Sequence, residues 1–128
     1  MMHISFFVEH KPVAKGRPRM GKGPVYTPAK TKAFETMFAW EAKRAMKGRP
    51  VQTGPCFVAL SFRFAKPKKL DELSRHVSKP DLSNLVKAVE DAMNGIVYHD
   101  DCQIYAIKAE KVYSPIEGIF VDVLFTEG

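Results

Sequence analysis

The period of the hydrophobic pattern changes several times along the chain, and each change predicts a secondary-structure element. Apolar and polar residues alternate over residues 4–9, as in a β-strand. The alternation is clearest over residues 57–64, where one face would carry Val58, Leu60, Phe62 and Phe64. Two more strands are predicted at residues 103–113 and 118–125. The residues between them, 114–118, are of turn-forming types and suit a hairpin.

Two segments instead have the spacing of an α-helix. Over residues 82–93 the apolar residues that share one face are Leu82, Leu85, Val86, Val89, Ala92 and Met93, and Gly95 then supplies a stop signal. The other helix is predicted to start at Thr27–Pro28, with threonine as the N-cap, and to end near Met46. It contains Trp40, the only tryptophan, which we expect to be packed against the core rather than to stack on DNA.

This order of elements predicts an α/β fold of the two-layer sandwich type, with two main helices packed on one face of a mixed β-sheet. The chain has 128 residues, of which 45% are hydrophobic and 27% charged, so it can build one core and is expected to form a single domain over residues 1–128. No segment approaches the ~20 apolar residues of a membrane span. The chain has only two cysteines, so a disulfide framework is not expected. We therefore expect a cytoplasmic protein without membrane attachment.

The charge balance points to a polyanionic partner. The formal net charge is +6 and the isoelectric point about 9.4, which does not by itself choose between DNA, RNA and anionic surfaces. Basic residues gather in a Gly- and Pro-rich stretch at 11–24 and again at 66–79. Composition alone leaves phosphate contact and an ordinary solvated loop open for these stretches. The candidate phosphate-binding residues are Lys15, Arg17, Arg19, Lys22, Lys66, Lys68, Lys69, Arg75 and Lys79.

The second helix carries the residues best suited to chemistry. Its polar face holds Asn84, Lys87 and Asp91, flanked by Ser83 and Glu90. Asp81 stands at its start, and Asp100 and Asp101 follow its end after a short strand-like apolar run at 96–98. If the chain folds back there, Asp101 approaches Asp81 and the polar face. Carboxylate and amide oxygens beside a lysine suit Mg²⁺, or Mn²⁺.

Each of these residues also has an ordinary explanation. Asp81 is placed to cap the helix, and Asp100–Asp101 would make a polar turn. Lys87 and the pair Glu90–Asp91 would serve as solvated helix residues. His76 is better explained as a surface-loop histidine than as a general base. His99 with Cys102 is a weak zinc signal, because the two residues lack a second pair.

The stretch Lys79-Pro80-Asp81-Leu82-Ser83-Asn84-Leu85-Val86-Lys87, followed by Asp100-Asp101-Cys102-Gln103-Ile104, resembles the RusA family of Holliday junction resolvases. The family pattern is Asp-x-Asp-Asn-Leu-x-Lys, a helix end like Asp-Ala-Leu, then Asp-Asp-x-Gln. Residues 15–19 and 25–28 fit as well, so the resemblance covers most of the chain. It implies the same two-layer fold and a small homodimeric endonuclease that cuts four-way junctions in branched DNA with Mg²⁺. The basic residues near these motifs would then contact phosphates.

Carried onto this chain, the resemblance assigns catalysis to Asp81, Asp101 and Lys87. Asp81 and Asp101 would be the main metal ligands, helped by Asp100, Asp91 or Glu90. One departure matters, because the second aspartate of the family motif is Ser83 here. Glu90 shares the helix strip of Ser83 and Lys87 and is the obvious substitute. The expected function is Mg²⁺-dependent junction resolution by paired nicks. The alternatives are a junction-binding protein with weak or no cleavage and a general branched-DNA or flap nuclease.

Overall fold

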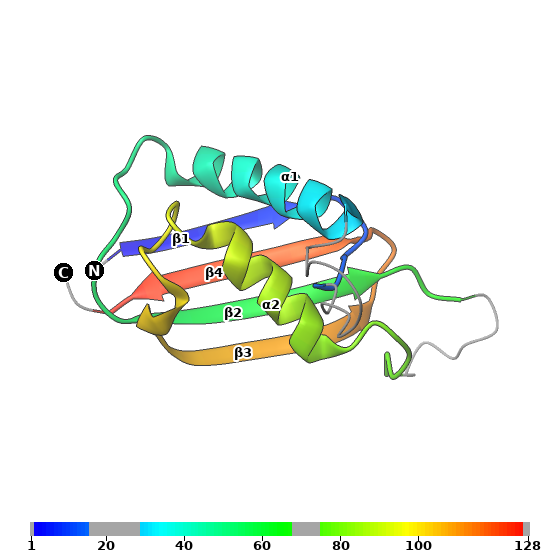
Figure 1. The fold of residues 1–128 in the computed structure, drawn as a ribbon. Coiled ribbons are helices and arrows are strands. Elements are labelled where there is room, and N and C mark those ends of the chain that lie inside the picture. The colour runs from blue at the N-terminus through cyan, green and yellow to red at the C-terminus, as the bar shows by residue number, and fades with distance from the viewer. Residues whose placement is uncertain (1, 16–28, 68–74, 127–128) are drawn as a thin grey trace, which may run out of the picture.

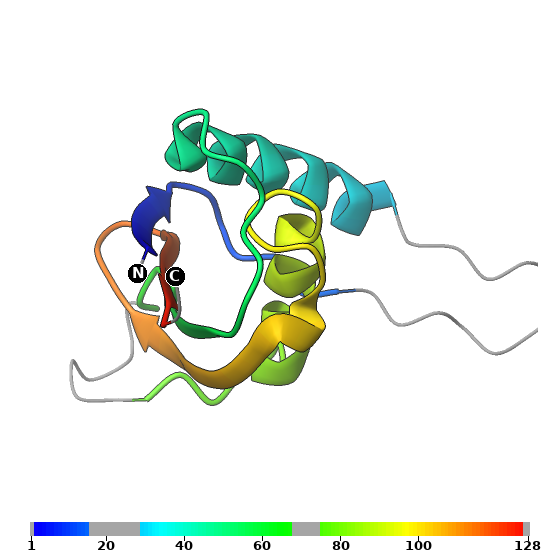
Figure 2. The same cartoon turned by 90° about the vertical axis from the view of Figure 1, so that its left-hand side faces the viewer.

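The computed structural model describes residues 2–15, 29–67 and 75–126. Its strands are β1 (Met2–Val8), β2 (Cys56–Phe64), β3 (Ile104–Tyr113) and β4 (Gly118–Phe125). Its α-helices are α1 (Ala29–Met46) and α2 (Leu82–Met93), and a short 3₁₀-helix, η1 (Asp101–Gln103), precedes β3. Figure 1 shows both α-helices lying over one face of the sheet. Seen from the side in Figure 2, helices and strands form two layers. The predicted two-layer α/β sandwich is confirmed.

The sheet has the strand order β1-β4-β2-β3. β4 runs antiparallel to both β1 and β2, whereas β2 and β3 are parallel, so the sheet is mixed as predicted. The hairpin expected at residues 114–118 is wrong, because β2 lies between β3 and β4. The physical reason is burial. β4 buries Ile119, Val121, Val123 and Phe125 and takes a central place, whereas β3 has exposed charged residues that suit an edge.

The core lies between the sheet and the helices. The inward face of β2 is the predicted one, and its four large side chains are at most 5% exposed. From α2 the core receives Leu85, Ala88, Val89, Ala92 and Met93. Burial of each large apolar side chain stabilises the fold by about 1.5–3 kcal/mol. These contacts fix the rotation of α2 about its axis, so its polar face must point away from the sheet.

All three helix ends that can be compared agree with prediction: α1 ends at Met46, and α2 begins at Leu82 and ends at Met93. After α2, Gly95 adopts a positive φ of 77°, as a helix stop requires. The start expected for α1 at Thr27–Pro28 lies outside the described residues. Within the described residues, no helix has the length and apolarity needed to cross a membrane.

The expectation of a strand-like run at residues 96–98 is wrong. Residues 95–97 form a turn, and Tyr98 makes only isolated β-bridges with Gln52 and Asn94. Val97 and Tyr98 are fully buried. The Tyr98 hydroxyl donates a hydrogen bond to the Glu90 carbonyl oxygen of α2 at 3.0 Å. This buried turn sends the chain back along α2 and so brings η1 beside the helix.

Candidate active site

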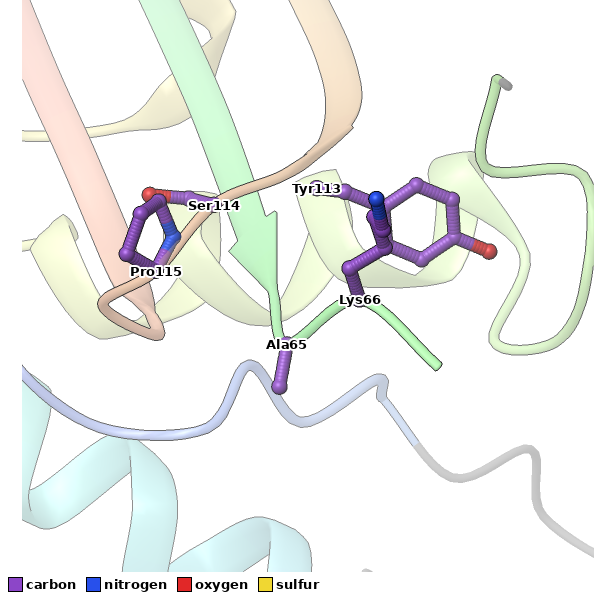
Figure 3. Close-up of a pocket in the computed structure, with 5 residues that line it drawn as sticks. All are labelled: Ala65, Lys66, Tyr113, Ser114 and Pro115. Carbon is purple, nitrogen blue, oxygen red and sulfur yellow. The ribbon is translucent and has the colours of Figure 1, made fainter. Parts of the chain in front are cut away.

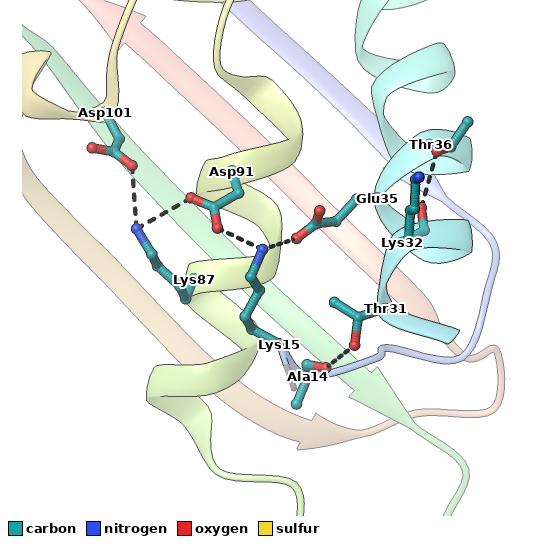
Figure 4. Close-up of polar contacts among 9 residues, drawn as sticks. All are labelled: Ala14, Lys15, Thr31, Lys32, Glu35, Thr36, Lys87, Asp91 and Asp101. Carbon is teal, nitrogen blue, oxygen red and sulfur yellow. Dashed lines mark hydrogen bonds and ion pairs between the residues drawn. The ribbon is translucent and has the colours of Figure 1, made fainter. Parts of the chain in front are cut away.

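Lys87 of α2 forms ion pairs with two carboxylates. Its Nζ lies 3.1 Å from Asp91 Oδ1 and 3.6 Å from Asp101 Oδ2 (Figure 4). Lys87 and Asp91 are four residues apart and therefore share one side of the helix. Asp101 comes from η1, after the chain has folded back. The predicted approach of Asp101 to the polar face of α2 is thus present in the structure.

A second lysine enters the same cluster from the N-terminal part of the chain. Lys15 Nζ lies 3.0 Å from Asp91 Oδ2 and 2.8 Å from Glu35 Oε1 of α1 (Figure 4). Its backbone N–H donates to the Asn84 carbonyl oxygen at 2.9 Å, which ties this segment to α2. Lys15 therefore lies between the two helices, within the cluster of charges. Glu35 was not predicted from the sequence, because an acidic residue inside a helix gives no signal of its partners.

The adjacent residues Asp100 and Asp101 make different contacts. Asp100 caps η1, where its side chain accepts a hydrogen bond from the Cys102 N–H at 3.4 Å. Gln103 Oε1 in turn accepts from the Asp100 N–H at 3.1 Å, and Gln103 Nε2 donates to two backbone carbonyls in residues 52–54, at 3.0 and 3.1 Å. Asp100 and Gln103 thus hold the turn. Asp101 is the acid of the pair that faces Lys87.

Asp81 occupies the N-cap position of α2, yet its side chain makes no capping hydrogen bond. Its Oδ1 lies 2.9 Å from Lys79 Nζ, and the Asp81 side chain is 46% exposed. The ordinary explanation as a cap therefore does not account for this carboxylate. Asp81 precedes Lys87 by six residues, about 9 Å along the helix axis. Joint metal binding by Asp81 and Asp101 stays a prediction.

Burial and neighbouring charges shift the pKa values of the cluster. Burial raises the pKa of Glu90, and the negative charge of Asp101 raises it further, against the opposing effect of Lys87. The pKa of Lys87 is raised, chiefly by its hydrogen bond to Asp91. Burial works to lower the pKa of Lys15, but Glu35 and Asp91 together hold it above its ordinary value. Both lysines therefore remain protonated at neutral pH.

The donor chemistry of the cluster suits a hard cation. Within the described residues, no three acidic, imidazole or thiol side chains converge closely enough to hold a metal ion. Asp91 and Asp101 instead place the Lys87 ammonium between them. Two carboxylates on either side of a positive charge, with Glu90 nearby, offer oxygen ligands only. Oxygen ligands favour Mg²⁺ or Mn²⁺ over zinc, and the binding of either ion by these residues stays a prediction.

The predicted phosphate-binding residues fall on several surfaces. Lys66 lines a hollow of about 530 Å³ together with Ala65, Tyr113, Ser114 and Pro115 (Figure 3). Arg75 is exposed, and Lys79 pairs with Asp81. Arg17, Arg19, Lys22, Lys68 and Lys69 lie outside the described residues. Contact of these basic residues with DNA stays a prediction.

Two aromatic expectations from the sequence are wrong. Trp40 is 65% exposed and is not packed into the core. His76 is not an ordinary surface histidine, because its ring centroid lies 4.4 Å from that of Phe64 and 5.0 Å from that of Tyr113. Its Nδ1 is buried and has no hydrogen-bond partner in the part of the chain that the structure describes, and burial lowers the pKa of His76. The stacked ring anchors the segment that leads into α2.

A small α/β domain with clustered carboxylates and lysines on its helix layer is a frame suited to phosphate chemistry. Residues 9–124 match the protein family described as Endodeoxyribonuclease RusA. The chain is also 35% identical over 139 residues to a protein of Bacillus subtilis (strain 168) called "Uncharacterized protein YqaN", which covers 97% of this chain and 96% of that protein. The chain therefore belongs to the RusA family of endodeoxyribonucleases, which act on branched DNA junctions.

Proposed function

We propose that this chain resolves four-way DNA junctions by Mg²⁺-dependent hydrolysis of phosphodiester bonds. Family membership supplies the class of activity. The observation that carries the proposal is the contact of Lys87 with Asp91 and Asp101, beside Lys15. An ordinary helix surface has no need to bring an acid from a distant turn and a lysine from the N-terminal segment to the same place.

The residues of the cluster have distinct tasks in this proposal. Lys87 would stabilise the negative charge that develops on the scissile phosphate. Asp101 and Asp81 would hold the metal with help from Asp91, Glu90 or Asp100. Mg²⁺ bound there would polarise the phosphate and lower the pKa of a water molecule. The water oxygen forms a new bond to phosphorus, the bond to the leaving sugar oxygen breaks, and that oxygen takes up a proton, which leaves one nick.

Paired nicks call for two sites, so the proposal includes a homodimer. A twofold dimer would match the approximate twofold symmetry of a junction and present one site to each of two opposed strands. The sheet face that points away from the helices supports this idea, because two large aromatic side chains remain partly exposed on it. They are Phe7 and Phe120, which pair across β1 and β4 and alternate with the buried residues of those strands. The free thiols of Cys56 and Cys102 suit the reducing cytoplasm that we propose as its location.

Two alternatives have specific support. Ser83 is exposed on the first turn of α2, where the family pattern has an aspartate, and this favours a junction-binding protein with weak cleavage. The predicted phosphate-binding residues would also serve a general flap or branched-DNA nuclease.

Cleavage of labelled four-way, flap and linear duplex substrates, each with and without Mg²⁺, separates the three functions. The proposal expects symmetric cuts in the four-way junction that require Mg²⁺ and are much slower on linear duplex. Tight junction binding without cuts would support the binding protein, and equal cutting of flaps would support the general nuclease.

A further inference from the structure

A hollow of about 520 Å³ lies outside the cluster described above, at the C-terminal ends of α1 and α2. The two ends lie at the same end of the helix layer (Figure 1). Trp40, Lys43 and Arg44 line one side of the hollow, and their spacing of three and four residues places them on one side of α1. Gly95 and Ile96, from the turn after α2, line the other side. We call this hollow the Trp40 groove.

Trp40 is the feature of the groove that folding does not explain. Its side chain is 65% exposed, so the chain leaves its largest apolar side chain mostly in water. Burial of an aromatic of this size would stabilise the fold, and α1 buries Phe34 and Phe38 instead. Exposed tryptophans of this kind are enriched where proteins bind their partners.

The lining of the groove is positively charged. Lys43, Arg44 and Arg49 contribute to it, and no acidic residue lines it among the described residues, although Arg44 Nη1 lies 3.4 Å from Oε1 of the neighbouring Glu41. Arg49 is held in place, because its Nε donates to the Met46 carbonyl oxygen at 2.9 Å and its Nη2 to that of Ala45 at 3.4 Å. These contacts leave further N–H groups of the guanidinium for a ligand. The negative end of the α1 dipole accounts for cations here, but not for an exposed indole beside them.

We propose that the Trp40 groove binds an unpaired nucleotide of branched DNA. The base would stack on the indole of Trp40, and the adjacent phosphates would contact Lys43, Arg44 and Arg49. This combination of an aromatic platform with a cationic track is how proteins hold single strands without reading sequence. A second copy of this chain is a poorer occupant, because its formal net charge of +6 would be repelled by the cationic lining.

The groove lies close to the charged cluster. Met93, the last residue of α2, follows Asp91 by two residues, about 3 Å along the helix axis, and Gly95 stands in the turn directly after it. Trp40 follows Glu35 by five residues, about 7–8 Å along the axis of α1. A strand spans such distances in about two or three stacked nucleotides, at roughly 3.4 Å each. The inference rests on the proposed function only for its partner, DNA. It further predicts that this chain binds branched DNA with an unpaired strand more tightly than fully paired duplex DNA.

Trp40 makes the test direct, because intrinsic tryptophan fluorescence reports on this residue alone. The full chain is titrated without Mg²⁺, once with an oligothymidylate of about eight nucleotides and once with a blunt duplex of equal length. The length of the oligothymidylate lies within the usual site sizes for single strands. We expect saturable quenching by the single strand and little by the duplex. Anisotropy of the labelled oligonucleotide then gives the affinity of each variant. Trp40→Ala should weaken binding by about 5- to 150-fold, the equivalent of ~1–3 kcal/mol per stacked base, and Trp40→Phe should weaken it less.

Tyr105→Ala is the matched control, since Tyr105 is also an exposed aromatic, at 60%, but lies on β3. It should leave the single-strand affinity unchanged, and thermal melts should show that both variants fold. Absence of quenching at saturating binding, equal quenching by blunt duplex, or equal affinities of Trp40→Ala and Tyr105→Ala would each overturn the inference. Cleavage is a separate readout. Junction cleavage without any Trp40 response would support the proposed function and refute the role of the Trp40 groove. Binding of single strands through Trp40 without any cleavage would support the groove and refute the proposed function.

Discussion

The substitution Lys87→Ala tests whether Lys87 acts in cleavage or in the stability of the fold. In the folded protein Lys87 Nζ contacts Asp91 at 3.1 Å and Asp101 at 3.6 Å, and its side chain is 53% exposed. Asp91 keeps a second cation, because Lys15 Nζ lies 3.0 Å from its other oxygen. Lys87→Ala therefore leaves Asp91 paired. At this exposure the lost ion pairs should cost only about 0.2–1 kcal/mol of unfolding free energy.

The expected effect on cleavage is far larger. Loss of one preorganised donor to a developing oxyanion typically lowers kcat by about 10²–10³-fold, or ~2.7–4 kcal/mol. Single-turnover cleavage of a four-way junction across a Mg²⁺ titration measures this change, and junction binding without metal is measured by anisotropy. Lys87→Arg should recover part of the rate because it keeps the charge. Lys108→Ala, which removes an exposed lysine from β3, serves as the control.

Two results would refute this reasoning. Near-normal cleavage by Lys87→Ala would place the chemistry away from the Lys87 cluster. A loss of several kcal/mol of unfolding free energy would instead show that Lys87 acts mainly in folding, which its exposure and the second partner of Asp91 argue against.

Three further predictions follow from the same structure. Asp101→Asn should abolish cleavage and spare junction binding, because it removes a proposed metal ligand and one negative charge. Gel assays of cleavage and of junction binding test this prediction, and retained cleavage would exclude Asp101 from the site. Glu90→Gln should severely reduce Mg²⁺-dependent cleavage and Ser83→Asp should partly restore it, whereas a Mg²⁺ titration of Glu90→Gln like that of the wild type would mean that Glu90 does not replace the family aspartate. The pKa of His76 is lowered by burial, so the unfolded chain binds more protons and the free energy of unfolding should fall as pH drops below about 6.5. His76→Phe should reduce that fall in urea melts between pH 7.5 and 5, and an identical pH slope would show that the buried ring does not cause it.

Local patterns in the sequence determined much of the fold. The bounds of α2 follow from a helical apolar period that Gly95 ends, and the inward face of β2 follows from strict alternation. Lys87 and Asp91 are also a local pair, since a helix brings residues four apart together whatever surrounds it. In each case the interaction joins residues close in the chain, so the order of residues is enough to predict it.

Only the tertiary structure decided which distant residues meet. The place of β4 between β1 and β2 depends on which strand buries most apolar surface, a comparison over the whole chain. Lys15 reaches Asp91 and Glu35 because the two helices pack side by side above the sheet.

The exposure of Trp40 has the same kind of cause. A helical period indicates which residues share a side of α1, but the packing of α1 on the sheet and on α2 decides which side is buried. Such outcomes depend on the sum of many weak contacts between segments far apart in sequence, and no single stretch of residues contains them.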